Sequence, residues 1–133
     1  MTCSSADGVP VRVLVVDDQE PFRLAAAAVV ATTPGFVLAG EAGSGEEALE
    51  AVRRLLPDIV LLDVVLPGMD GWTTAERIRA GHPSVRVVLL STYDGAEQYD
   101  RAASTDVRFV PKDRFDADVL LSAACAGSSS AAD

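Results

Sequence analysis

The feature that most constrains the fold is a regular alternation between short β-branched, apolar runs and longer segments with helical spacing. Five such runs, each bounded by turn-forming residues, predict strands at Val11–Val16, Phe36–Ala42, Ile59–Leu62, Val85–Leu90 and Val107–Val110. Polar and apolar residues scarcely alternate within these runs, which is typical of strands buried on both faces of a sheet. We therefore expect one sheet that is covered by helices on both sides.

The segments that follow the strands carry apolar residues at the spacing of amphipathic helices. The clearest begins at Ser44-Gly45-Glu46-Glu47, a capping box, and its last turn is followed by Pro57. Similar spacing follows Pro21 and recurs at 72–78, 96–103 and 115–123. Five strands joined by crossover helices predict a doubly wound α/β domain, flavodoxin-like, with a parallel five-stranded sheet flanked by five helices. Its ligand site should lie at the carboxyl ends of the strands.

Polar side chains occur where four of the five predicted strands end. In strand order they are Asp17 and Asp18, Asp63, Ser91 and Thr92, and Lys112, the only lysine of the chain. Because the carboxyl ends of parallel strands share one edge of the sheet, we expect these side chains to meet. A vicinal aspartate pair or a lone lysine is usually a solvated surface feature, but chance alone seldom places all of these groups in this order.

Three carboxylates at one edge repel each other, and one of them would have a raised pKa unless a cation lay nearby. A divalent cation and the Lys112 ammonium together would neutralise them. Oxygen ligands with open coordination positions suit Mg²⁺, and a hydroxyl and an ammonium suit phosphoryl oxygens. The pattern therefore predicts metal-assisted formation of an aspartyl phosphate. Asp63 is the expected acceptor, because it stands alone at the end of the most apolar strand and precedes the loop Pro67–Gly71.

The amino-acid composition and net charge exclude some classes of binding partner. The chain is 49% hydrophobic, so it can bury a core, and it carries 20 acidic against 11 basic residues, a net charge of −9. That balance argues against direct DNA binding and against adsorption to anionic membranes. No apolar run approaches the roughly 20 residues of a bilayer span. Residues 1–8 have neither a basic start nor an apolar stretch, so we expect no secretory signal and a cytoplasmic location.

Four motifs together resemble the receiver domain of bacterial two-component response regulators. They are Val13-Leu14-Val15-Val16-Asp17-Asp18, Leu62-Asp63-Val64-Val65-Leu66-Pro67-Gly68-Met69-Asp70-Gly71, Leu90-Ser91-Thr92-Tyr93 and Val110-Pro111-Lys112. The likeness covers about Val11 to Ala126 and implies the strand order 2-1-3-4-5. We therefore expect 11–126 to be the receiver domain and 1–10 a flexible N-terminal segment, and the low-complexity composition of 127–133 predicts a disordered tail.

The resemblance implies a role for each site residue. Asp63 would take a phosphoryl group from the phosphohistidine of a sensor histidine kinase, and Lys112 would pair with that carboxylate and then with the phosphate. The implied Mg²⁺ ligands are Asp18, Asp63 and the Val65 backbone carbonyl, with Asp17 acting through water. Ser91 would be the switch hydroxyl and Phe109 the aromatic partner that turns inward, with Thr92 and Tyr93 close to the phosphate.

The output would pass through the fourth helix, fifth strand and fifth helix to an unknown downstream effector, and a homodimer is possible. Val65 and Tyr93 are poor at orienting water, so we expect slow self-hydrolysis of the phosphorylated form. Many receiver domains have a proline directly after the lysine, whereas Asp113 follows Lys112 here, which argues against a cis peptide bond before residue 113.

Two other functions stay open at the level of sequence. An aspartyl-nucleophile phosphatase would need a second acid two residues after Asp63, where this chain has Val65. A phosphorylation-independent, receiver-like adaptor would not need the full set of carboxylates, hydroxyl and lysine. We therefore expect a phosphoacceptor domain that assists its own phosphorylation, and not an enzyme that acts on a separate substrate.

Overall fold

The computed structural model describes residues 9–91 and 107–132, with side chains described as far as residue 124. The elements are β1 (Val11–Val16), α1 (Glu20–Thr32), β2 (Phe36–Ala42), α2 (Gly45–Leu55), β3 (Ile59–Asp63), α3 (Gly71–Gly81), β4 (Arg86–Ser91), β5 (Arg108–Pro111), the 3₁₀ helix η1 (Lys112–Arg114) and α5 (Ala117–Ala132). The five strands pair in parallel in the order β2-β1-β3-β4-β5, which confirms the doubly wound sheet. The helix expected at 96–103 lies outside the described residues.

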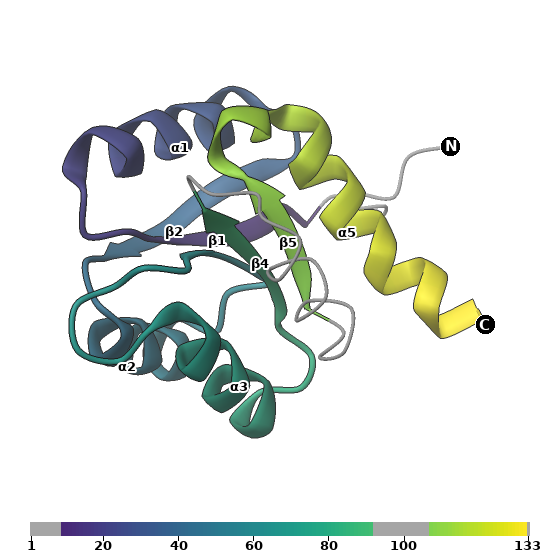
Figure 1. Ribbon diagram of the computed structural model, residues 1–133. Coiled ribbons are helices and arrows are strands. Elements are labelled where there is room, and N and C mark those ends of the chain that lie inside the picture. The colour runs from purple at the N-terminus through teal and green to yellow at the C-terminus, as the bar shows by residue number, and fades with distance from the viewer. Residues whose placement is uncertain (1–8, 92–106, 133) are drawn as a thin grey trace.

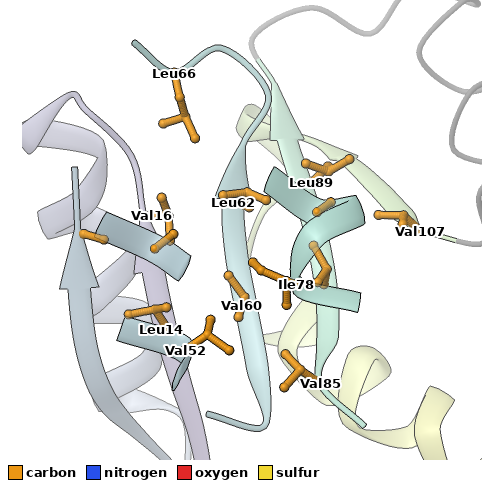
Figure 2. Close-up of a cluster of buried hydrophobic side chains, with 14 of the residues drawn as sticks. Leu14, Val16, Val52, Val60, Leu62, Leu66, Ile78, Val85, Leu89 and Val107 are labelled. Atoms are coloured by element: carbon orange, nitrogen blue, oxygen red, sulfur yellow. The ribbon is translucent and has the colours of Figure 1, made fainter. Parts of the chain in front are cut away.

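The helices cover the sheet in two layers, with α1 and α5 on one face and α2 and α3 on the other (Figure 1). Alternate residues of each strand pack against the two helix layers, because successive side chains of a strand point to opposite faces of the sheet. Val13 and Val15 pack toward Ala26, Val30 and Leu120. On the other face Val52 of α2 and Ile78 of α3 lie against Leu14, Val60 and Leu62, as Figure 2 shows. Burial on both faces explains why the strands are almost uniformly apolar.

The bounds of three strands differ from the sequence prediction by one residue, at the C-terminal end of β3 and at both ends of β4 and β5. β3 includes Asp63, β4 runs from Arg86 to Ser91, and β5 from Arg108 to Pro111. The polar residues therefore belong to the ladder, with Asp63 in register with Leu90 and Ser91 with Pro111. Strand pairing extends to these polar residues because the backbone of the neighbouring strand still offers hydrogen-bond partners. The sequence prediction ended each strand at its last apolar residue and so missed this extension.

Helix α3 approaches β3 unusually closely at its first residue. Asp70 caps the helix by accepting a hydrogen bond from Thr73 N at 2.8 Å, and Gly71 N donates to Val64 O at 2.8 Å. A Cβ atom at Gly71 would lie 2.3 Å from Asp63 O and 2.6 Å from Val64 Cα. Only glycine permits this approach, so Gly71 allows α3 to begin directly behind the acidic end of β3.

Helix α5 continues to Ala132, past the domain end expected at Ala126. The segment 127–132 contains no proline, and its one glycine, Gly127, costs only about 1 kcal/mol in a helix interior. The composition that suggested a frayed tail is thus compatible with helix. Over the described ranges, no helix has the length and apolar character needed to cross a membrane.

Candidate functional site

The site begins with Asp17, the first residue after β1. Its backbone N–H donates to Ala42 O at 3.0 Å, and its Oδ1 accepts a hydrogen bond from Gln19 N at 2.8 Å. Arg23 adds a third constraint, because its Nη1 donates to Asp17 O at 2.7 Å while its Nε pairs with Glu41 at 3.0 Å. These contacts join the ends of β1 and β2 to α1 and hold Asp17 with only 1% of its surface exposed.

Lys112 reaches this acidic edge from the start of η1, directly after β5. Its Nζ lies 2.7 Å from Asp17 Oδ2 and 3.4 Å from Asp63 Oδ2, with only 11% of the side chain exposed. Both carboxylates therefore share one buried ammonium, and Asp17 makes the shorter contact. The sequence analysis expected Lys112 to pair with Asp63, whereas in the structure it contacts both Asp17 and Asp63. Over the described ranges no peptide bond is cis, as expected for the bond before residue 113.

Burial dominates the electrostatics of Asp63. Loss of hydration raises its pKa from the ordinary 3.8 to about 6, and repulsion from Asp17 acts in the same direction. Attraction to Lys112 and the hydrogen bond from Val65 N to Asp63 Oδ1, at 3.3 Å, oppose the rise without cancelling it. The site therefore destabilises the negative charge on Asp63, although a lysine lies beside it.

The carboxylates of Asp17, Asp18 and Asp63 can each place an oxygen within 4.8 Å of the others. Asp17 and Asp63 are buried, whereas Asp18 is exposed. Asp17 Oδ2, although paired in charge with Lys112, has no aligned hydrogen-bond donor within the described part of the chain. A buried carboxylate oxygen without an aligned donor, beside two further carboxylates, is suited to a hard cation with oxygen ligands, so these residues fit the predicted Mg²⁺.

The other predicted site residues that the structure describes are Ser91, Phe109 and Val65. Ser91 is buried at the end of β4, and Phe109 of β5 is buried in the layer beneath α2 and α3. The side chain of Val65 is 63% exposed, two residues after Asp63. Thr92 and Tyr93, expected near the phosphate, lie outside the described residues. The structure thus brings Asp17, Asp18, Asp63 and Lys112 together, as the strand ends predicted.

The sequence interpretation missed two residues that support the site. The spacing after Pro21 indicates only that Phe22 lies on the apolar face of a helix, yet the Lys112 ammonium lies over its ring, 4.5 Å from the centroid. Arg23 was assigned no role, yet it links Asp17 to Glu41. No local pattern distinguishes these residues from other helix residues, because both contacts join segments that are distant in the sequence.

Residues 13–124 match the family model for the response regulator receiver domain. The chain is 45% identical over 95 residues to protein-glutamate methylesterase/protein-glutamine glutaminase 5 of Anaeromyxobacter dehalogenans, covering 70% of this chain and 26% of that protein. It is 32% identical over 99 residues to the response regulator protein VraR of Staphylococcus saprophyticus, covering 74% and 47% respectively. The matches thus span a quarter to a half of these relatives.

Solved structures give the same result. The signal receiver domain of NarL from Mycobacterium tuberculosis superposes with a TM-score of 0.81 at 32% identity, covering 87% of this chain and 97% of that one. A chain of the CheX–CheY–BeF₃–Mg²⁺ complex from Borrelia burgdorferi superposes with a TM-score of 0.74 at 28% identity, covering 88% of each chain. Both likenesses extend over almost the whole described fold.

Proposed function

The chain belongs to the response regulator receiver domain family, and we propose that it is a signalling switch in which Asp63 accepts a phosphoryl group from a histidine kinase. The observation that carries the proposal is the convergence of three carboxylates and one ammonium at the carboxyl ends of the strands. Lys112 Nζ lies 3.4 Å from Asp63 Oδ2, and Asp17 and Asp18 complete the acidic group. This is the donor and acceptor set that phosphoryl transfer to a carboxylate requires.

In the proposed reaction a carboxylate oxygen of Asp63 attacks the phosphorus of a phosphohistidine. The new P–O bond forms as the P–N bond breaks, and the electron pair of that bond stays on the imidazole nitrogen, which then takes a proton. Asp63 must be ionised to attack, and a pKa of about 6 leaves it mostly ionised at neutral pH. The Lys112 ammonium would leave Asp17 in part and donate to the equatorial phosphoryl oxygens.

The residues that would hold Mg²⁺ are Asp18, Asp63 and the backbone carbonyl of Val65, with Asp17 acting through water. When bound, the ion would supply positive charge that offsets repulsion between the carboxylates and the incoming phosphoryl oxygens. Asp17 Oδ2 supports this assignment, since it is a buried acceptor whose cationic neighbour, Lys112, is not aligned as a hydrogen-bond donor.

The proposed readout uses Ser91 and Phe109. Phosphorylation adds negative charge and new acceptor oxygens, toward which the Ser91 hydroxyl would move. Phe109 lies in β5, the strand paired with β4, so a shift of Ser91 would alter the packing beside it. The surface made by β5, α5 and the helix expected at 96–103 would then change its affinity for an effector or a second copy. Couplings of this kind are typically about 1–3 kcal/mol.

The test is phosphate incorporation from acetyl phosphate, and then from a phosphorylated histidine kinase, in the presence of Mg²⁺. We expect one phosphoryl group per chain in the native protein and none in Asp63→Ala. Asp58→Ala is the matched control, because Asp58 lies at the opposite end of the same strand region and should leave incorporation intact.

Incorporation that survives in Asp63→Ala would overturn the assignment of the acceptor. A native protein that takes up no phosphate and shows no Mg²⁺ affinity by calorimetry would instead support the phosphorylation-independent adaptor. Turnover of a phosphate ester would support the phosphatase, which the apolar Val65 disfavours because it stands where such an enzyme needs an acid.

A further inference from the structure

The Lys112 ammonium contacts groups from three separate parts of the fold. Asp17 follows β1, Asp63 ends β3, and the Phe22 ring lies in the first turn of α1, with its centroid 4.5 Å from Nζ. The two carboxylates account for the charge of the lysine. The aromatic ring carries no formal charge, so its position against a buried ammonium requires a separate explanation.

We propose that Phe22 is a positioning residue that keeps the Lys112 ammonium directed at Asp63, an inference that rests on the proposed function. The negative face of an aromatic ring attracts a cation, and the attraction grows as water is excluded. Unlike a carboxylate, the ring has no lone pair that competes for the ammonium protons. Lys112 could therefore turn from Asp17 toward a phosphoryl oxygen while it keeps its contact with the ring.

The position of Phe22 is itself fixed by the turn that carries Lys112. The Phe115 ring lies 6.4 Å from the Phe22 ring at 57°, and Phe115 N donates to Lys112 O at 3.3 Å. Both ends of the turn 112–115 thus face the same aromatic ring. The contact therefore fixes the direction of the side chain and the placement of the loop together.

Without the ring, the ammonium would have an alternative place to go. A cavity of about 550 Å³ opens beside the lysine, lined by Gln19, Pro21, Phe22, Lys112 and Asp113. Asp113 is exposed and carries the opposite charge, so it and the water in the cavity offer Lys112 other partners. Phe22 forms a wall of this cavity, and an aliphatic side chain there would exclude water less completely and lack the attraction of the ring. A smaller fraction of the protein would then have Lys112 ready for transfer.

The first measurement uses the fact that Lys112 is the only lysine of the chain. Lysine-selective ¹³C labelling gives one ε-methylene signal, whose protons should be shifted upfield by the ring beneath them. We expect this upfield shift in the native protein and in Phe22→Tyr, which keeps the ring. In Phe22→Leu, which keeps an apolar side chain without a π face, we expect the signal to move toward its free-lysine position.

The second measurement is the rate constant of phosphorylation by acetyl phosphate, a small donor that needs no docking surface. We expect Phe22→Leu to react about fivefold more slowly, the size expected of a partly desolvated cation–π contact. Phe22→Tyr should react within twofold of the native rate. Phe36→Leu, the same change at a buried phenylalanine of the amino end of β2, is the control for general packing, and it should keep both the shifted lysine signal and a near-native rate.

The proposal is overturned if Phe22→Leu reacts as fast as the native protein or keeps the native lysine signal. It is also overturned if Phe36→Leu slows the reaction as much as Phe22→Leu, since the effect would then be packing alone. A native protein that takes up no phosphate would refute the proposed function instead, while the lysine signal would still report whether the ring contact exists.

Discussion

The amino and carboxyl ends of the sheet differ in how their charged side chains are compensated. At the amino ends of the strands Arg12 N donates to Asp58 Oδ2 at 2.9 Å, and Arg12 Nη1 donates to Leu56 O at 3.1 Å and to Leu55 O at the end of α2. Asp58 N and Arg86 N complete the network through backbone bonds of 2.8 and 2.9 Å. The guanidinium of Arg12 and the carboxylate of Asp58 each have a hydrogen-bond partner, and the Asp58 side chain is exposed to water.

At the carboxyl ends, two buried carboxylates share one ammonium and one oxygen has no aligned donor in the described chain. The fold would be more stable without this crowding, because burying charge with incomplete compensation costs free energy. The comparison teaches that charge is compensated locally at the amino ends and left crowded at the carboxyl ends. This difference is expected if the proposed function is correct, because a bound cation would offset the crowded carboxylates.

The largest effect on stability is expected from substitutions of Gly71 and Gly81, the first and last residues of helix α3. At Gly71, beside Asp63, an alanine Cβ would lie 2.3 Å from a backbone oxygen, and the backbone would have to move. We expect Gly71→Ala to lower the free energy of unfolding by about 3 kcal/mol. Gly81, at the other end of the helix, has open space around its Cβ position, so Gly81→Ala should raise it slightly, by about 0.5 kcal/mol.

Urea unfolding of the two variants measures this contrast. Equal effects at Gly71 and Gly81 would show that the close approach of α3 to β3 does not constrain the acidic end of the sheet.

The next effect concerns the charge on Asp63. Its pKa of about 6 in the folded chain exceeds the ordinary 3.8, so the folded state binds this proton more tightly than the unfolded state. The destabilisation is absent below about pH 4, develops as the pH rises toward 6, and is complete above it. Asp63→Asn removes it and should stabilise the metal-free protein by about 2 kcal/mol at pH 7, less than the full 3 kcal/mol because solvent screens the charge in part.

The measurement is urea unfolding in EDTA between about pH 4 and 7, with the difference between variant and native protein expected to grow with pH. Asp58→Asn, at the well-paired end of the sheet, should not stabilise the protein at pH 7. If Asp63→Asn is less stable than the native protein at pH 7, the Asp63 charge is compensated and the contrast between the two ends fails.

The smallest effect concerns the lifetime of the phosphorylated form. Val65 is 63% exposed, and its N–H donates to Asp63 Oδ1, so the residue is next to the acceptor carboxylate and open to solvent. An amide there could orient a water molecule, which valine cannot do. We expect Val65→Asn to speed the loss of phosphate about threefold, followed after removal of the donor, while Val37→Asn on the distant edge strand leaves it unchanged. Equal decay rates in Val65→Asn and the native protein would exclude this role.

Most of the fold could be read from the sequence because its determinants are local. The uniformly apolar strands, the Ser44 cap and the turn residues each specify an element within a few neighbours, and β1 and β2 have the predicted bounds. The meeting of Asp17, Asp63 and Lys112 was also predictable, since the carboxyl ends of parallel strands must share one edge. The strand ends at Asp63 and Ser91 were missed by one residue, because ladder pairing depends on the neighbouring strand.

The sequence by itself determined which chemical groups stand at the end of which strand, because the alternation of elements leaves a parallel sheet few other arrangements. Only the tertiary structure decided how those groups share charge: that Lys112 is nearer to Asp17 than to Asp63, that burial outweighs the lysine in raising the pKa of Asp63, and that Phe22 lies beneath the ammonium. These outcomes depend on distances of a few ångströms and on the exclusion of water, and both arise only when distant segments pack together.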